Sequence, residues 1–365
     1  MSKIRVGILF GGRSAEHEVS LQSAKNIVDA IDKNKYEVVL IGIDKQGAWH
    51  LDEGSRFLLP TTGSELPTLT ASTENLALVP GKQEEQLVQL SGRETPGSLD
   101  VVFPILHGPF GEDGTVQGLL KLANIPFVGA GVLGSAVGMD KDVMKRLLRD
   151  AGIPIARFIT LQKYPASEVG FDEARDQLGL PLFIKPANLG SSVGIHKVRD
   201  REEFDRAVRD AFNYDNKVLI EECIVGREIE CAVLGNDEPV ASVVGEILPS
   251  HEFYSYEAKY LDENGAALEI PAKLPQEISE RIRQFAIKTF SVLCCEGMAR
   301  VDFFLRNGEE IIVNEINTIP GFTRISMYPK LWEASGLPYG ELIDKLIELA
   351  LEKFEREKGL KTDRT

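Results

Sequence analysis

The sequence predicts an α/β protein in which a domain built on a parallel sheet is followed by two smaller units of mixed α and β structure. Three observations support this fold class. Strand and helix segments alternate in the first third, short strands and two helices fill the middle, and the last third combines long strands with a β-hairpin. A chain of 365 residues is long enough for two or three domains. We expect domains at 1–129, 130–223 and 224–365.

Apolar segments bounded by turn residues define the N-terminal domain. The order is strand, Gly-rich turn, helix and strand, at Ile4–Phe10, Val19–Ile31 and Tyr36–Asp44. A strand at Asp100–Leu106, a helix near Thr115–Ala123 and the short strand PFVG continue the alternation. Residues 47–98 are rich in Thr, Ser, Gly, Pro and Gln, so we expect a surface excursion with short strands. The alternation predicts a parallel sheet with helices on both faces.

The two later units follow from the same signals. A helix at Lys141–Asp150 ends before Gly152-Ile153-Pro154, which is a stop signal. The α+β unit that follows should have strands at ARFITL, PLFIKPA, SVGIHKV and KVLIEEC, and helices at Asp172–Leu178 and Arg201–Asn213. The last unit should contain strands at Arg227–Leu234 and Pro239–Leu248, a polar loop, a further strand, a helix at Gln276–Leu293, the hairpin and a helix at Tyr339–Glu357.

Composition excludes several classes of protein. With 41 basic and 56 acidic residues the net charge is −15, which argues against a general binder of nucleic acid or anionic membranes. No apolar run reaches the roughly 18 residues that span a bilayer, and the N-terminus enters a strand without a signal peptide. The four cysteines form no CxxC pair, so we expect reduced thiols in a cytoplasmic protein and no structural zinc.

The hairpin in the stretch from Met298 to Gly321 presents a candidate metal site. Asn307-Gly308 is a strong turn signal, and a turn centred there would place Asp302 opposite Val313 and Arg300 opposite Glu315. On this register one face carries Arg300, Asp302, Glu315 and Asn317. Carboxylate and amide oxygens with open coordination positions suit Mg²⁺. Taken alone, the pattern fits equally a solvated hairpin face with an incidental ion pair.

Two further segments are candidates for nucleotide binding. FIKPANLGSSVGIHKV joins two strands by a loop of small residues whose N–H groups could hold phosphate oxygens, and Lys185 in the apolar strand before it would need an anionic partner. The alternative is a Gly-Ser hairpin loop with a snorkelling lysine. VLIEECIVGREIE is an apolar strand carrying Glu221 and Glu222 that could read an adenine and its ribose, or be an ordinary charged edge strand.

Three other segments are candidates for binding a small substrate. GILFGGRSAEHEVS leads from a strand into a helix N-terminus, which favours an anion, while Glu16 could hold an ammonium group; an amino acid has both charges. His107 in HGPFGEDG follows a buried strand where open α/β sheets bind ligands, although a structural histidine is the alternative. HEFYSYEAKY should be a loop, in which Lys259-Tyr260 is either a lid or surface decoration.

Taken in order, these segments resemble the D-alanine–D-alanine ligases of the ATP-grasp superfamily, in their longer subtype. The resemblance covers essentially the whole chain and includes GGRSAEHEVS, LHGPFGEDG, MDKDVMK, IKPANLGSSVG, IEECIVGREIE, YEAKY, ARVDFF and NEINTIPGFT. Glu222 and Cys223 stand where the shorter subtype has a basic and an aromatic residue. The resemblance implies a Rossmann-like N-terminal substrate domain and two ATP-grasp subdomains, with ATP held between the latter.

The resemblance also implies roles for individual residues. Lys141 and Lys185 would neutralise phosphates under the Gly190–Gly194 loop, which includes Ser192. Glu221, Glu222, Cys223 and Ile224 would line the adenine slot, with Glu228 on the ribose. Asp302, Glu315 and Asn317 would hold two Mg²⁺ (or Mn²⁺) ions. Glu16 and His107 would bind the first D-alanine, and Ser326 and Met327 the second. Lys259 would also bind substrate, and Glu16, Ser191 and Tyr260 would be linked by hydrogen bonds.

The implied reaction is the ATP-dependent ligation of two D-alanines through a D-alanyl phosphate, for peptidoglycan precursors. Arg300 and the Gly321 N–H would stabilise the tetrahedral oxyanion. D-alanine–D-lactate and D-alanine–D-serine ligases are the alternatives, and the Lys259-Tyr260 pair resembles that of dipeptide-forming enzymes. A regulatory ATP-binding protein is a further alternative, which the complete set of ligands argues against. The resemblance implies a homodimer that acts on D-alanine and ATP.

Overall fold

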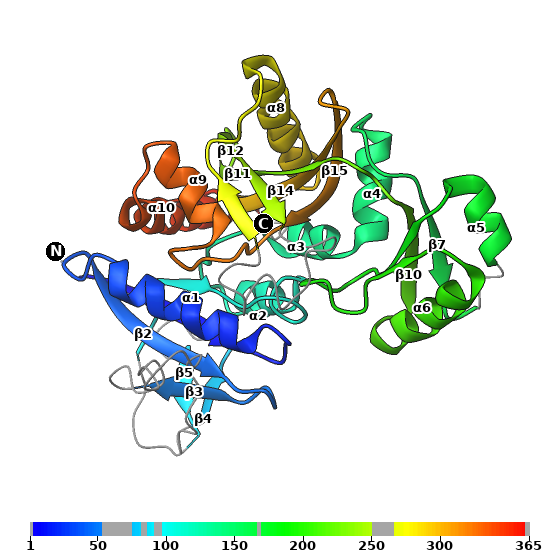
Figure 1. The fold of residues 1–365 in the computed structure, drawn as a ribbon. Coiled ribbons are helices and arrows are strands. Elements are labelled where there is room, and N and C mark those ends of the chain that lie inside the picture. Colours follow the sequence, from blue (N-terminus) through cyan, green and yellow to red (C-terminus); the bar gives the residue numbers. More distant parts are fainter. Residues whose placement is uncertain are drawn as a thin grey trace.

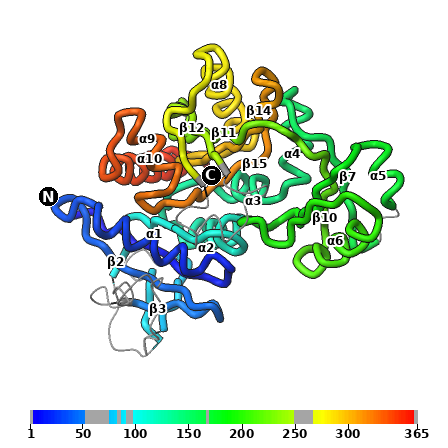
Figure 2. Tube along the Cα trace, viewed as in Figure 1, coloured from blue at the N-terminus to red at the C-terminus, as the bar shows by residue number. Residues whose placement is uncertain are grey.

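The computed structural model describes residues 3–52, 75–81, 86–90, 97–165, 169–249 and 266–361. Within these residues the chain forms three sheets with helices between and around them (Figure 1). The trace in Figure 2 runs from the N-terminal sheet through α2, α3 and α4 to a middle lobe, and returns to a C-terminal sheet beside the first. In the described part of the chain no helix is long and apolar enough to cross a membrane.

The N-terminal sheet is mixed, with a parallel centre. Strands β1 (Ile4–Gly11), β2 (Tyr36–Ile43) and β6 (Val101–Pro104) are parallel, which confirms the predicted alternation. The excursion adds β3 (Trp49–Asp52), β4 (Asn75–Leu78) and β5 (Leu87–Gln89), all antiparallel, so the order is β5-β4-β3-β2-β1-β6. The short strands of the excursion thus extend the predicted parallel sheet at one edge, whereas the strand expected at PFVG is only a bridge at Phe127.

Helices cover both faces of this sheet, as predicted. The apolar stripe Leu21, Ala24 and Ile27 of α1 (His17–Ala30) is buried on one face. On the other face, Val116 and Leu120 of α2 (Thr115–Leu122) pack with Leu9. The first face also packs against the C-terminal helices, so the N-terminal and C-terminal domains share one hydrophobic core.

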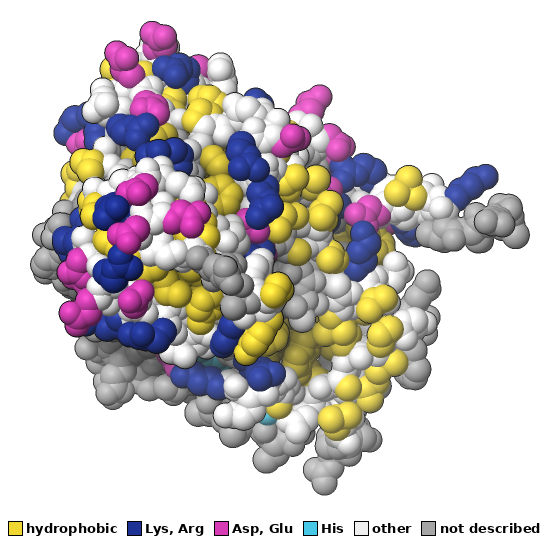
Figure 3. All heavy atoms as spheres, turned by 90° about the vertical axis from the view of Figure 1, so that its right-hand side faces the viewer, with side chains coloured by type: hydrophobic (Ala, Val, Ile, Leu, Met, Phe, Trp, Pro, Cys, Tyr) yellow, Lys and Arg dark blue, Asp and Glu magenta, His cyan; other side chains and the backbone are white. Residues whose placement is uncertain are grey.

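The middle lobe is a small antiparallel sheet with its own core. It contains β7 (Phe158–Gln162), β8 (Leu182–Pro186), β9 (His196–Val198) and β10 (Lys217–Glu222) in the order β7-β10-β8-β9. Helices α5 (Phe171–Leu178) and α6 (Arg201–Tyr214) pack on the face that carries Ile184 and Ile220. Lys185 and Glu221 alternate with these residues and therefore lie on the opposite face. On the side that Figure 3 shows, acidic and basic side chains are interspersed. In the middle lobe, Arg175 and Arg201 both pair with Asp172.

The C-terminal sheet is antiparallel and carries helices on both faces. Its order is β13-β12-β11-β14-β15, formed by β11 (Arg227–Gly235), β12 (Val240–Pro249), β13 (Ala266–Glu269), β14 (Gly297–Arg306) and β15 (Glu310–Asn317). Helix α8 (Gln276–Val292) buries Ile282 and Phe290 on one face. Helices α9 (Met327–Ala334) and α10 (Tyr339–Lys358) pack toward the other face and the N-terminal domain.

Among the described residues, two helices were not predicted. Helix α3 (Val132–Met139) has the apolar, Gly-containing sequence VLGSAVGM, which shows no polar face, and it precedes α4 (Lys141–Asp150) directly. Helix α9 has Pro329 as its third residue and spans only eight residues. The strand expected at SVGIHKV is confined to β9, because Ser192 and Gly194 lie at positive φ before it. Short segments of this kind lack the periodicity on which helix and strand prediction depends.

The predicted register of the β14–β15 hairpin was wrong, but its consequence for the shared face holds. Asn307 and Gly308 are at positive φ, yet the ladder starts with Arg306 opposite Glu310, one residue beyond the predicted pair. A β-bulge at Asn314 then adds a second shift, so Asp302 lies opposite Glu315 and Arg300 opposite Asn317. Each shift alone would reverse the faces of β15, and the two together restore them. The bulge also explains why Val313 and Ile316, three residues apart, enter the same core.

Helix α3 depends on glycine for its close approach to the C-terminal domain. A Cβ added at Gly134 would lie 2.4 Å from the carbonyl oxygen of Cys294, whereas one at Gly118 of α2 would meet nothing within 4 Å. We expect Gly134→Ala to lower the free energy of unfolding by about 1–3 kcal/mol. Gly118→Ala should leave it unchanged or raise it by about 0.5–1 kcal/mol. Urea denaturation of both variants tests this, and equal effects would contradict the packing described.

Candidate functional site

The three sheets meet at a cleft of about 470 Å³. Its lining comes from α1, the loops after β6 and β8, strands β11, β14 and β15, and the segment that leads into α9. The predicted site residues that line it are Glu16, His107, Gly190, Ser191, Glu228, Arg300, Asp302, Glu315, Asn317, Gly321, Ser326 and Met327. Side chains far apart in sequence are therefore brought together as expected. Lys259 and Tyr260 lie outside the described residues.

Three carboxylates lie side by side on the floor of the cleft. Glu230 of β11 is the cross-strand partner of Asp302, which in turn is the partner of Glu315. Adjacent like charges repel unless cations separate them. Arg300 supplies one: its Nε lies 2.7 Å from Asp302 Oδ1 and 2.8 Å from Glu230 Oε2, and its Nη2 lies 2.8 Å from Asp302 Oδ2. We call Glu230, Asp302 and Glu315 the carboxylate row.

The second cation at this row comes from α4. Lys141, the first residue of the helix, lies 3.5 Å from Glu315 Oε2 through its Nζ, which also donates to the Leu189 carbonyl at 2.7 Å. Leu189 directly precedes the Gly190–Gly194 loop, so one ammonium joins the hairpin to the loop. Lys141 itself does not line the 470 Å³ cleft.

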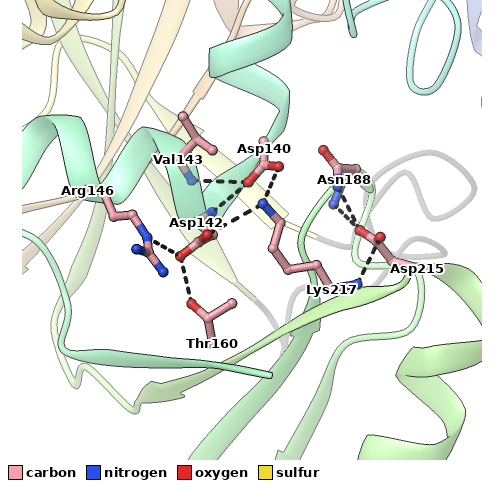
Figure 4. Close-up of polar contacts among 8 residues, drawn as sticks. All are labelled: Asp140, Asp142, Val143, Arg146, Thr160, Asn188, Asp215 and Lys217. Atoms are coloured by element: carbon pink, nitrogen blue, oxygen red, sulfur yellow. Dashed lines mark hydrogen bonds and ion pairs between the residues drawn. The ribbon is translucent and has the colours of Figure 1, made fainter. Parts of the chain in front are cut away.

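A polar network fixes the start of α4 (Figure 4). Asp140 caps the helix by accepting from the N–H groups of Asp142 and Val143, both at 3.1 Å. Lys217 of β10 lies 2.5 Å from Asp140 Oδ2 and 3.4 Å from Asp142 Oδ2. Burial alone would raise the pKa of Asp142, but hydrogen bonds from Thr160 and Arg146 and the charge of Lys217 lower it. The network therefore ties α4 to β7 and β10 with an ionised carboxylate at its centre.

The predicted adenine slot and Lys185 form a second group beside the cleft. Lys185 Nζ lies 2.5 Å from Glu221 Oε2, so the anionic partner that the sequence analysis required is here a carboxylate. Glu222 is paired with Arg157, whose Nη2 lies 2.7 Å from Glu222 Oε2. Like Ser192, Cys223 and Ile224, these residues do not contribute to the 470 Å³ lining. The sequence analysis missed Lys145, which is 1% exposed and lies 3.1 Å from Glu221 Oε1.

Glu16 and Ser191 join the N-terminal domain to the loop after β8. Ser191 Oγ donates to Glu16 Oε1 at 2.5 Å, and the Glu16 side chain is buried. Ser191 and Ser192 both lie at positive φ, and a Cβ at Gly190 would approach Glu16 Oε2 to 3.4 Å. Two members of the predicted set Glu16, Ser191 and Tyr260 are thus in contact, and the third lies outside the described residues.

His107 and Glu112 hold the backbone of one residue of the C-terminal domain, Ile319. His107 Nδ1 lies 3.1 Å from the Ile319 carbonyl oxygen, so Nδ1 carries the proton and donates, while Nε2 accepts from Ser23 Oγ at 3.3 Å. Glu112 accepts from the N–H groups of Gly108 at 2.9 Å and Ile319 at 3.2 Å. Burial lowers the pKa of His107, which keeps the ring neutral. Burial, followed by the charge of Glu16, raises the pKa of Glu112 to about 8.

Helix α9 begins at the far end of the cleft. Ser326 precedes it, its Oγ accepts from the Thr323 N–H at 3.1 Å, and it lies 2.7 Å from Thr323 Oγ1. A Cβ at Gly321 would come within 3.1 Å of Ser326 Oγ, so glycine permits this approach. The N–H groups of the first helical turn have no intrahelical acceptors and favour an anion. Ser326 and Met327 therefore mark a site suited to a carboxylate.

Asp302, Glu315 and Asn317 suit a hard divalent cation. All three line the cleft, and Asn317 donates from Nδ2 to Asp302 Oδ2 at 2.9 Å. Across the described ranges no three His, Cys, Asp or Glu side chains form a metal cluster by themselves. A site of this kind needs further oxygen ligands, which Mg²⁺ commonly takes from nucleotide phosphates and water.

Two acidic residues of the cleft were missed by the sequence analysis. Glu230 stands two residues after Glu228 in β11, and this spacing placed both on one face. Glu112 lies within HGPFGEDG, where only the histidine had been considered. The alternation of strand residues could have identified Glu230. The contacts of Glu112 depend on tertiary packing against Ile319.

Comparisons with known proteins give a consistent result. The family described as "D-ala D-ala ligase N-terminus" matches residues 5–130, and "D-ala D-ala ligase C-terminus" matches residues 147–348. The D-alanine–D-alanine ligase of Shouchella clausii is 59% identical over 362 residues, which are 99% of this chain and 98% of that protein. The solved D-alanine–D-alanine ligase of Coxiella burnetii has a TM-score of 0.86 at 42% identity, covering 98% of this chain and 97% of the other. VanG, a D-Ala:D-Ser ligase from Enterococcus faecalis, has a TM-score of 0.83 at 37% identity, covering 96% and 100%.

The raised pKa of Glu112 predicts a pH effect on stability. Its pKa is raised from 4.5 to about 8 in the folded state, so between these values the folded protein holds a proton that the unfolded chain has lost. Wild-type stability should therefore fall, relative to Glu112→Gln, as the pH rises through this window. We expect the difference in free energy of unfolding to grow by at least about 1 kcal/mol from pH ~5 to ~8. Urea denaturation at several pH values measures it, and a constant difference would contradict the assignment.

Proposed function

The chain belongs to the D-alanine–D-alanine ligase family and joins two D-alanine molecules with the use of ATP, and on this basis we propose how its cleft performs the ligation. The observation that supports the proposal best is that one cleft combines an anion-binding helix end, a buried carboxylate pairing with a loop serine, and the carboxylate row with its arginine. Each of these groups is complementary in charge to a group of the substrates.

ATP is proposed to bind beside the hairpin, with its phosphates toward the Gly190–Gly194 loop. Lys141 and Lys185 would neutralise the phosphates, Ser192 would donate to them, and Glu228 would accept from the ribose. Glu221, Glu222, Cys223 and Ile224 would line the adenine slot. The Lys141 ammonium, 3.5 Å from Glu315 and in contact with Leu189, supports this arrangement because it already stands between the hairpin and the loop.

Divalent ions, Mg²⁺ or Mn²⁺, would be held by Asp302, Glu315 and Asn317 and would supply charge neutralisation at the phosphates. The side chains of this chain contribute the remaining charge. Because Arg300 pairs with Glu230 as well as Asp302, it keeps a carboxylate partner when Asp302 serves another cation. Arg300 can therefore stay on the cleft floor throughout the reaction.

The first D-alanine is proposed to place its ammonium at Glu16 and its carboxylate near His107. His107 is held by Ile319 and Ser23, so it shapes the subsite as a neutral ring. The second D-alanine would place its carboxylate at Ser326 and Met327, where α9 offers its first N–H groups. Lys259 and Tyr260 are proposed to complete the enclosure. Their positions lie outside the described residues.

The chemistry follows from these positions. The first carboxylate is a poor electrophile, so it attacks the γ-phosphorus of ATP, displaces ADP and forms an acyl phosphate, aided by positioning and charge neutralisation. The amine of the second D-alanine then attacks the acyl carbon and expels phosphate. Arg300 and the Gly321 N–H would stabilise the tetrahedral oxyanion, each donor contributing about 3 kcal/mol. Exclusion of water protects the acyl phosphate from hydrolysis.

The cellular setting of the enzyme is also part of the proposal. All four cysteines are free thiols, two of them buried with pKa values raised by burial, which suits a reducing cytoplasm. We infer that the dipeptide serves peptidoglycan synthesis. The homodimer implied by the sequence resemblance stays a prediction.

The acceptor is the direct test of the proposed function. With ATP and Mg²⁺, D-alanine should release phosphate, whereas D-lactate or D-serine in place of the second D-alanine should be used less well at neutral pH. Phosphate release and product mass spectrometry measure this. Absence of release with every acceptor would contradict the ligase function. Preference for D-lactate or D-serine would assign the chain to an alternative acceptor class, of which VanG is the D-serine example.

A further inference from the structure

A buried ion cluster lies between α4 and the middle-lobe sheet. Glu221 of β10 is 2% exposed and uses one oxygen for each of two lysines: Oε1 lies 3.1 Å from Lys145 Nζ, and Oε2 lies 2.5 Å from Lys185 Nζ. Its cross-strand partners are Phe158 and Phe183, and the two ammonium groups lie 5.9 Å and 5.7 Å from the centres of these rings. The cluster is therefore enclosed by aromatic side chains and excludes most water.

The cluster carries one positive charge more than its own carboxylate neutralises. Burying an uncompensated charge is costly, so a surplus ammonium in such a place requires an anion. Burial lowers the pKa of both lysines, and the charge of Glu221, followed by that of Glu315 of the hairpin, raises it. Through Glu315 the cluster is electrostatically connected to the carboxylate row, where the divalent ions are proposed to bind.

The side chains of the two lysines differ in how exposed they are. Lys185 is on a strand that leads to the Gly190–Gly194 loop, and its side chain is 12% exposed. Lys145 is 1% exposed and is fixed on α4, one turn after Lys141, by a helix whose start is held by Asp140 and Asp142. Lys185 is therefore the lysine that we expect to turn toward an incoming anion, and Lys145 the one that we expect to stay on Glu221.

We propose that Lys145 is a positioning residue for nucleotide binding: it holds the Glu221 carboxylate, so that Lys185 can exchange Glu221 for a phosphate of the nucleotide. The inference rests on the proposed function, because it assigns Lys185 to a phosphate. Since each lysine uses a different oxygen of Glu221, the departure of Lys185 leaves the Lys145 contact intact. Without Lys145, the transfer of Lys185 would leave a buried carboxylate unpaired, so Lys185 would remain on Glu221.

A double-mutant cycle tests this with nucleotide binding as the readout. We expect Lys145→Met to weaken the binding of a non-hydrolysable ATP analogue with Mg²⁺ by about tenfold or more, because Lys185 is retained by Glu221. The KM for D-alanine should stay within about twofold. In a Glu221→Gln background Lys185 is already released, so adding Lys145→Met should change the affinity by less than about twofold. Calorimetry without D-alanine gives the four dissociation constants.

Controls separate positioning from folding. Lys288→Met removes an exposed lysine of α8 that contacts the Ala151 carbonyl, and should leave nucleotide binding unchanged. If Lys145→Met does not fold, the two variants in the Glu221→Gln background still test whether Lys145 acts only through Glu221, because a loss of affinity on adding Lys145→Met there would overturn the inference. Wild-type affinity in Lys145→Met, or an equal loss in both backgrounds, would overturn the inference. Failure of the wild-type protein to bind the nucleotide would instead contradict the proposed function.

Discussion

The carboxylate row of Glu230, Asp302 and Glu315 is the electrostatic constraint on which the rest of the cleft depends. Three acidic side chains in adjacent cross-strand positions destabilise the sheet unless cations are held against them. Two parts of the chain supply those cations. Arg300 lies on β14, the strand that also carries Asp302, and Lys141 lies at the N-terminus of α4. The same charge distribution favours divalent ions that bind together with phosphate. The ions add positive charge to the row, and the phosphate gives the lysines an anionic partner.

The shared hydrophobic core sets this floor against the N-terminal domain. Helices α9 and α10 pack both on the C-terminal sheet and on the face of the N-terminal sheet that carries α1. Across the boundary, neutral His107 and the buried carboxyl of Glu112 take the carbonyl and the N–H of Ile319, two residues before Gly321. The loop that is proposed to bind the first substrate is thereby coupled to the peptide group that precedes the proposed oxyanion donor. The middle lobe has a separate core and meets the cleft through polar groups, namely Ser191 with Glu16 and Lys141 with Leu189.

Much of this organisation could be predicted from sequence, and the exceptions have physical causes. Periodicity gave the long helices and strands to within a few residues, and the Asn307-Gly308 turn identified the hairpin with its four polar residues on one face. The register itself could not be read, because the one-residue shift at the turn and the bulge at Asn314 leave no signal in composition and compensate each other. Helices α3 and α9 lack amphipathic periodicity. The contacts of Lys145 with Glu221 and of Glu112 with Ile319 join residues far apart in the sequence, so local patterns do not reveal them.

The central claim is that the hairpin face formed by β14 and β15 holds the divalent ions of the nucleotide complex. Mn²⁺ binding in the presence of a non-hydrolysable ATP analogue, followed by electron paramagnetic resonance, tests it most directly. Glu315→Gln removes a charge from the carboxylate row, whereas Glu310→Gln removes one from the exposed start of the same strand, where Glu310 pairs with Arg306. The account predicts that Glu315→Gln weakens Mn²⁺ binding by about tenfold or more, and that Glu310→Gln leaves it unchanged. Wild-type Mn²⁺ affinity in Glu315→Gln would contradict the account.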